Sequence, residues 1–100
     1  VVHCVKDTEG WQIADGLYVP GSRIIDKPNF GWPHWDKEAL EEVELVGLCT
    51  DICVVSNALL LKAHFPEVPI AVDAAGCAGV TPQAHEAALA TMVSCQIQVK

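Results

Sequence analysis

The feature that most constrains the fold is residues 43–56, which read VELVGLCTDICVVS: an apolar run, a tight polar turn and a second apolar run. Val43 to Leu48 is short, apolar and rich in β-branched residues, which is typical of a buried strand. From Thr50 the apolar residues recur at helical spacing, and Pro66 closes the segment. The sequence therefore predicts a strand, a sharp turn and a buried helix.

Cys53 falls in the first turn of this predicted helix, where Thr50 or Asp51 would serve as the N-cap. Unpaired backbone amides and the positive end of the helix dipole lie there, and both favour the thiolate. A thiolate at such an elbow can attack a carbonyl, with nearby amides as oxyanion donors. The alternative is that Cys53 is a small core residue, as most unpaired cysteines in apolar segments are. The spacing leaves both interpretations open.

Composition limits the remaining classes. One hundred residues allow one domain, 1–100, and 51% hydrophobic residues with a mean hydropathy of +0.29 suffice for a packed core. A formal charge of -7 argues against a nucleic-acid partner or an anionic membrane surface. No run approaches the roughly 18 apolar residues of a membrane helix, so we expect a soluble protein.

The five cysteines form an odd set without a CxxC pair, which argues against a disulfide framework and for a reducing, cytoplasmic setting. Cys49 and Cys53 are four residues apart, but the histidines have no finger-like spacing, which argues against a structural zinc site.

The other segments alternate between predicted strands, helices and loops. The expected elements are a loop over 6–22, strands at 23–27, 68–73 and 95–99, a short acidic helix at 36–42, a small-residue loop at 74–80, and a helix from Pro82 to about Val93 capped by Thr81. This alternation predicts an α/β fold: a three-layer α/β/α arrangement around a mostly parallel sheet covered on both faces.

Ligands of such sheets bind beyond the carboxyl ends of the strands. Lys27 ends the predicted strand at 23–27 and Cys53 follows the one at 43–48, so we expect both at one edge, where the ammonium would favour the thiolate. Lys27 taken alone reads as an ordinary surface lysine. Phe30 and Trp32 lie in the aromatic loop FGWPHW, which either walls a pocket for a flat substrate or simply packs onto the body.

These residues together resemble the isochorismatase-like cysteine hydrolases, the superfamily of nicotinamidases and related amidases. The resemblance rests on GLCTDICV, the preceding Lys27, the following DAAGCAGVT and the helix bearing His85, and it covers nearly the whole chain. It implies that Cys53 is the nucleophile, which forms a thioester, and that Lys27 is the lysine of a Cys-Lys-Asp triad. It also implies an oxyanion hole from the backbone amides of Cys49 and Cys53, and a cis peptide bond between Leu48 and Cys49.

By the same resemblance, His3 matches a histidine that binds a divalent metal (Zn, Mn or Fe) in nicotinamidases, although the cysteine chemistry itself requires no cofactor. The family's catalytic aspartate lies in a first strand that this chain does not match. We therefore expect the chain to be the carboxyl-terminal portion of a longer, N-terminally truncated hydrolase domain, to be inactive or nearly so alone, and to associate through exposed apolar surface.

Three functional hypotheses follow. The favoured one is hydrolysis of a small amide, nicotinamide-like or carbamoyl, by an enzyme that the resemblance implies is a homo-oligomer at full length. The second is isochorismatase-type hydrolysis of a vinyl ether, which family members perform without the cysteine. The third is a binding or oligomerisation module of the same fold that has lost the base.

Overall fold

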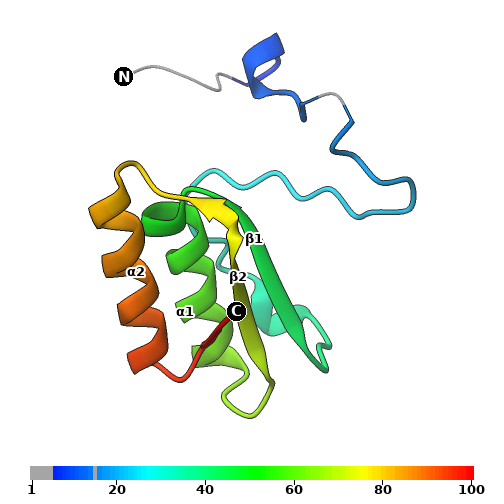
Figure 1. Ribbon diagram of the computed structural model, residues 1–100. Coiled ribbons are helices and arrows are strands. Elements are labelled where there is room, and N and C mark those ends of the chain that lie inside the picture. The colour runs from blue at the N-terminus through cyan, green and yellow to red at the C-terminus, as the bar shows by residue number, and fades with distance from the viewer. Residues whose placement is uncertain (1–5, 15) are drawn as a thin grey trace.

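The computed structural model describes residues 6–14 and 16–100. Its elements, in chain order, are the 3-10 helices η1 (Glu9–Trp11) and η2 (Trp35–Lys37), strand β1 (Val43–Leu48), the π-helical turn η3 (Thr50–Val54), helix α1 (Val55–His64), strand β2 (Ile70–Ala78), helix α2 (Pro82–Ser94) and strand β3 (Gln98–Val99). Figure 1 shows them in sequence colours. None of the helices in these residues has the length and apolarity that a membrane span requires.

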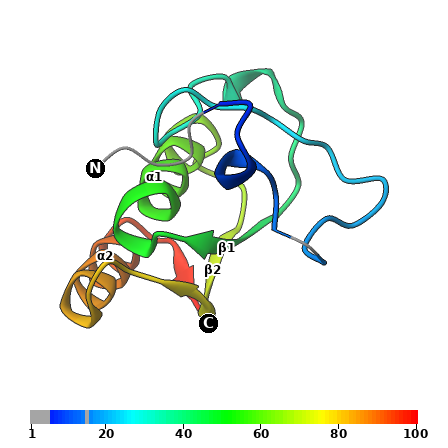
Figure 2. The same cartoon turned by 90° about the horizontal axis from the view of Figure 1, so that it is seen from above.

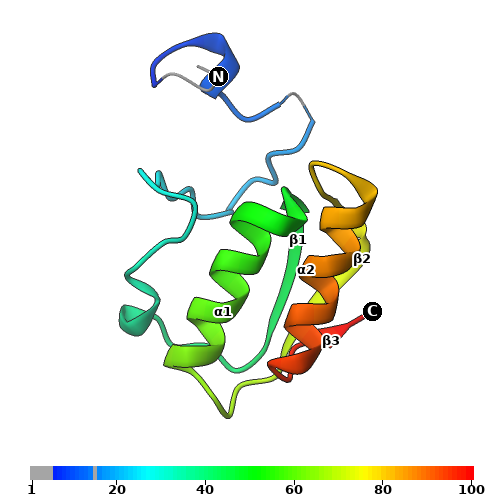
Figure 3. The same ribbon diagram turned by 90° about the vertical axis from the view of Figure 1, so that its left-hand side faces the viewer.

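The sheet has three strands in the order β1-β2-β3, and both pairings are parallel. The predicted parallel α/β fold is thereby confirmed. Helices α1 and α2 lie side by side on one face of this sheet (Figure 3). The buried core fills the space between them and the strands, and consists of Val54, Ala58, Leu61, Ile70, Val72, Ala88, Leu89, Met92 and Ile97.

The other face of β1 is open within the described residues. Val43 and Leu45 are half-buried against the core, whereas Val46 and Leu48 alternate with them and are 61% and 68% exposed. Residues 6–14 and 16–100 thus build one helical layer of the predicted three-layer arrangement and leave an apolar sheet face uncovered.

The helix ends follow the predicted capping chemistry in α2 but not in α1. The Thr81 hydroxyl accepts a hydrogen bond from the Ala84 amide at 3.0 Å, with Pro82 in the first turn, as predicted. At the start of η3 the N-cap is Cys49, which makes no side-chain cap. The prediction of Thr50 or Asp51 as N-cap is wrong, because both side chains bond to the segment around α2 instead.

Strand β2 is longer than predicted and includes most of the expected loop at 74–80. After a register shift between Leu45 and Gly47, β1 continues to pair with β2 as far as Leu48 and Ala78. The small residues that suggest a loop instead let the strands approach: a Cβ on Gly76 would lie 2.8 Å from Val46 Cγ1.

Three further boundaries differ from the sequence prediction. Residues 23–27 form no strand with any described residue, because the sheet consists of β1, β2 and β3 and β1 pairs only with β2. The acidic helix at 36–42 shrinks to η2, since the backbone is already extended at Glu38. The last strand is only Gln98–Val99, because Gln96 has a φ of 67° and turns the chain.

The N-terminal segment, blue to cyan in Figure 1, runs as a long loop over the end of the molecule at which α1 begins. The view from above shows the same segment passing over that end (Figure 2). It brings Lys27 to the elbow between β1 and α1.

Candidate active site

The elbow carries Cys53 in η3, directly before α1. The amides of Ile52 and Val54, on either side of Cys53, both donate to the carbonyl oxygen of Cys49 at 3.0 Å. This shared acceptor winds the turn tightly, and it leaves the Cys53 side chain half-buried at the end of the sheet. The peptide bond between Leu48 and Cys49 is cis, as the resemblance implies.

Lys27 reaches the same place from the N-terminal loop. Its Nζ lies 3.5 Å from Cys53 Sγ and donates to the carbonyl oxygen of Asn29 at 3.1 Å. The structure therefore brings the two predicted side chains together although 26 positions separate them. The prediction that Lys27 ends a strand is wrong: Lys27 lies in a loop, and this loop rather than pairing between strands brings it to Cys53.

The polar residues just before Cys53 fasten the elbow to the start of α2. Thr50 is fully buried, and its Oγ1 lies 2.7 Å from Nδ1 of the half-buried His85. Oδ1 of Asp51 accepts from the Val80 amide at 3.0 Å. One oxygen of the carboxylate two residues from Cys53 is thereby occupied by a backbone amide, so Asp51 serves as a structural anchor of the turn.

The aromatic loop packs on α1. The ring centroids of Trp32 and Trp35 are 4.8 Å apart in an edge-to-face arrangement, and those of Trp32 and His34 are 5.7 Å apart. Phe30 is 62% exposed. The packing interpretation fits the half-buried Trp32, whereas a role for Phe30 or Trp32 in a substrate pocket stays a prediction.

Asn57, which the sequence reasoning missed, holds this loop. Its Oδ1 accepts from the Trp32 amide at 2.8 Å and from Trp35 Nε1 at 3.1 Å, and its Nδ2 donates to the carbonyl oxygens of Phe30 at 3.2 Å and Cys53 at 3.0 Å. The only signal in the sequence is a carboxamide one turn after Cys53 in a largely apolar helix.

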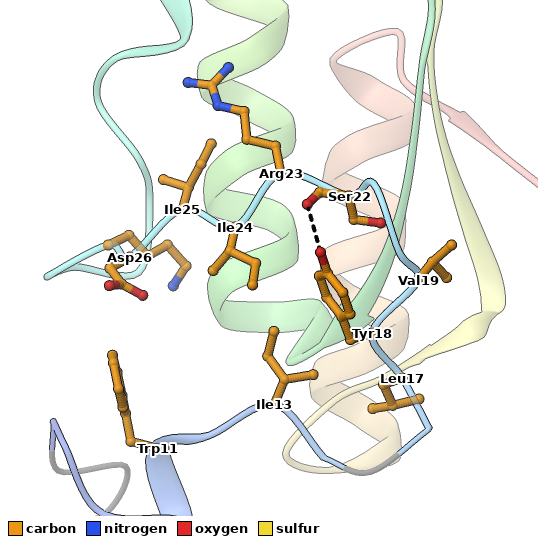
Figure 4. A pocket seen from close by; sticks show the side chains of 11 residues that line it. Trp11, Ile13, Leu17, Tyr18, Val19, Ser22, Arg23, Ile24, Ile25 and Asp26 are labelled. Carbon is orange, nitrogen blue, oxygen red and sulfur yellow. Dashed lines mark hydrogen bonds between the residues drawn. The ribbon is translucent and has the colours of Figure 1, made fainter.

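Two hollows adjoin Lys27. One of about 420 Å³ is lined by Lys6, Trp11, Asp26, Lys27 and Pro28. The other, of about 440 Å³, is shown in Figure 4, where Ile13, Leu17, Tyr18 and Ile24 line its wall and the Tyr18 hydroxyl donates to the Ser22 carbonyl oxygen. Trp11 borders both hollows and is a second residue that the sequence reasoning did not single out.

The predicted metal ligand His3 lies outside the described residues. Among residues 6–14 and 16–100, no three His, Cys, Asp or Glu side chains gather so that they could hold a metal ion. The described residues thus do not form a metal centre, and no step is assigned to a metal here. The oxyanion role of the Cys49 and Cys53 amides likewise stays a prediction.

A family model, described as the isochorismatase domain, matches residues 1–99. The chain belongs to the isochorismatase family. This isochorismatase-family chain is 37% identical to the nicotinamidase from Staphylococcus aureus over 61% of its own length and 38% of that enzyme, with a TM-score of 0.55. No match was found among curated proteins.

Two further solved structures share the fold of this isochorismatase domain. The nicotinamidase/pyrazinamidase from Bacillus subtilis matches with a TM-score of 0.80 and 24% identity, and covers 99% of the chain and 62% of that enzyme. The pyrazinamidase of Pyrococcus horikoshii, solved in complex with zinc, matches with a TM-score of 0.82 and 23% identity, and covers 99% of the chain and 61% of that enzyme. The chain therefore spans less than two thirds of the length of each of these enzymes.

Proposed function

We propose that this chain carries the nucleophile and the lysine of a cysteine amidohydrolase that cleaves a small amide, nicotinamide-like or carbamoyl. The observation that carries the proposal is the 3.5 Å contact between Lys27 Nζ and Cys53 Sγ at a strand-to-helix elbow. The 37% identity to a nicotinamidase supports the class of substrate. Trp11, beside Lys27, offers a flat apolar surface for an aromatic amide.

In the proposed reaction, Sγ of Cys53 forms a bond to the amide carbonyl carbon. The carbon–nitrogen bond then breaks, ammonia departs with the proton that came from the thiol, and a thioester remains. Water hydrolyses the thioester to the carboxylic acid and restores the thiol. Lys27 would stabilise the thiolate and the negative charge that develops on the oxygen.

The proton transfers need a general base. Asp51 is bonded to the Val80 amide, and the family's aspartate motif has no match in this sequence. We propose that the carboxylate base is supplied from outside these 100 residues, and that the chain alone is inactive or nearly so.

The test is ammonia release from nicotinamide and from N-carbamoyl compounds, measured for the polypeptide as it is encoded from its own initiator and for the 100-residue chain. Cys53→Ala is expected to lower the rate by roughly a thousandfold or more, as is usual when a nucleophile is removed. Cys95→Ala is the matched control, because that thiol is exposed at the end of α2. Hydrolysis that survives Cys53→Ala would contradict the mechanism.

Alkylation separates the enzyme from a non-catalytic binding or oligomerisation module. A catalytic Cys53 is expected to react with iodoacetamide much faster than Cys49, Cys77 and Cys95 near neutral pH. If Cys53 reacts no faster than the exposed Cys95 and no amide is cleaved, the binding module becomes the better hypothesis.

We also propose a cytoplasmic location and a homo-oligomer. The four described cysteines are all unpaired, which supports a reducing compartment. The open apolar face with Val46 and Leu48 supports association. Fractionation of cells and light scattering of the purified protein test the two proposals separately.

A further inference from the structure

Lys27 and Cys53 meet without any regular element to hold them together. Lys27 stands in a loop that forms no strand with described residues, and its side chain is exposed. The Lys27 ammonium donates to the carbonyl oxygen of Asn29, two residues further along the same loop. This bond fixes the lysine side chain relative to its loop but does not connect the loop to the elbow. Something else must fix the loop against α1.

The Asn57 carboxamide makes that connection. Three of its four hydrogen bonds go to residues 30–35, which follow Lys27 after Pro28 and Asn29, and the fourth goes to the carbonyl oxygen of Cys53. One side chain thus bonds both to the loop that carries the lysine and to the residue that carries the thiol. A carboxamide suits this position, because it offers two donors and an acceptor with two lone pairs.

Close packing at Gly31 also holds the loop against α1. A Cβ on Gly31 would lie 2.6 Å from Leu60 Cδ1 and 3.5 Å from Ser56 Cβ, so the loop backbone rests directly on the α1 surface beside Asn57. Apolar packing alone would allow the loop to shift along α1, whereas the four directional hydrogen bonds of Asn57 fix the position of the loop on the helix.

We propose that Asn57 is a positioning residue that sets the distance between Lys27 and Cys53 by clamping residues 30–35 to the elbow. The inference rests on the proposed function, because only there do Lys27 and Cys53 act as a catalytic pair. Its contact geometry, however, can be measured without any turnover.

The probe is o-phthalaldehyde, which condenses with a thiol and a primary amine in contact to give a fluorescent isoindole. Two molecules of water are lost, and the reagent's two carbonyl carbons become ring carbons, one bonded to the sulfur and both to the nitrogen. Peptide mapping by mass spectrometry then identifies a Lys27–Cys53 link. The wild-type chain is expected to form this link, since the two atoms lie 3.5 Å apart.

Asn57→Leu keeps the approximate size of the side chain and removes all four hydrogen bonds, and is expected to lower the isoindole yield at least fivefold. Gln83→Leu makes the same kind of change at an exposed site on α2 and is expected to leave the yield unchanged. Trp35→Phe keeps an aromatic ring but removes the Nε1 donor together with part of the indole, so an intermediate yield is expected even if Asn57→Leu fails to fold.

The rate of alkylation of Cys77, which is half-buried and packed against the core, serves as an internal reference for folding, because general loosening raises it while loss of the clamp does not. The proposal is overturned if wild-type protein gives no Lys27–Cys53 link. It is also overturned if folded Asn57→Leu, or Trp35→Phe in its place, gives the wild-type yield. A normal link without amide hydrolysis would support the clamp and refute the proposed function, so the two ideas fail separately.

Discussion

Replacing Gly79 or Gly31 by alanine compares the cost of pushing a side chain against rigid backbone with the cost of pushing it against a flexible side chain. Gly79 lies beside the first turns of α2: an added Cβ would be 2.9 Å from the Cβ and the amide nitrogen of His85 and 3.0 Å from its Cα. Gly31 would meet a nearer atom, Leu60 Cδ1 at 2.6 Å, but that atom is the end of a flexible side chain. Neither glycine has a positive φ, so backbone strain does not enter the comparison.

The expected cost follows from what has to move. Alanine at position 79 can be accommodated only if the backbone of α2 withdraws by several tenths of an ångström, and such overpacking typically costs about 1–3 kcal/mol. Replacing glycine also restricts the unfolded chain, which offsets about 0.4–1 kcal/mol. We expect Gly79→Ala to lower the free energy of unfolding by about 1–2 kcal/mol. Gly31→Ala should stay within about 1 kcal/mol of wild type, because Leu60 can change rotamer.

The assay is urea unfolding followed by far-UV circular dichroism, with thermal melts as a second measure. For a domain of this size, Gly79→Ala should lower the melting temperature by roughly 5–15 °C. Equal slopes of the urea transitions are required for a valid comparison. If Gly31→Ala is the more damaging substitution, distance alone sets the cost, and the reasoning from rigidity is refuted.

Three further predictions concern the elbow and the core. Thr50→Val should lower the free energy of unfolding in urea by about 1–3 kcal/mol, because it removes the buried 2.7 Å hydrogen bond to His85. The control Thr91→Val, at an exposed position, should change it little, and equal effects of the two substitutions would contradict a special role for the Thr50–His85 bond. Lys27→Met should slow iodoacetamide alkylation of Cys53 about fivefold and leave the unfolding midpoint unchanged, and an unaltered rate would exclude electrostatic assistance. Leu61, which is 1% exposed, should lose about 2–5 kcal/mol of unfolding free energy when it is replaced by alanine. The control is Val93→Ala, at 59% exposure, and a loss in Leu61→Ala no larger than in this control would place Leu61 outside the core.

Where a segment's own chemistry decides its structure, the sequence predicts it well. The apolar run at 43–48, the Thr81 cap and Pro82 each contain the reason for their element, and the strand and helix appear where expected. The juxtaposition of Lys27 and Cys53 is confirmed as well, although a loop rather than a strand achieves it.

The missed features depend on partners far along the chain. Residues 23–27 have strand-like composition, but a strand requires a neighbouring ladder, and no described residue supplies one. Asn57 looks like a tolerated polar residue in a helix, and its loop partners stand 22 to 27 positions earlier. Local patterns carry no information about such distant bonds.

The attachment of the elbow to Val80 and His85 has a consequence for synthesis on the ribosome. Cys53 is translated before Val80 and His85, the two residues that hold its turn through Asp51 and Thr50. Until residues 80–85 have left the exit tunnel, a nascent chain bears Cys53 without the anchors of Thr50 and Asp51. Premature termination between Cys53 and α2 would therefore release a polypeptide that contains Cys53 but lacks the two bonds that hold its turn in place.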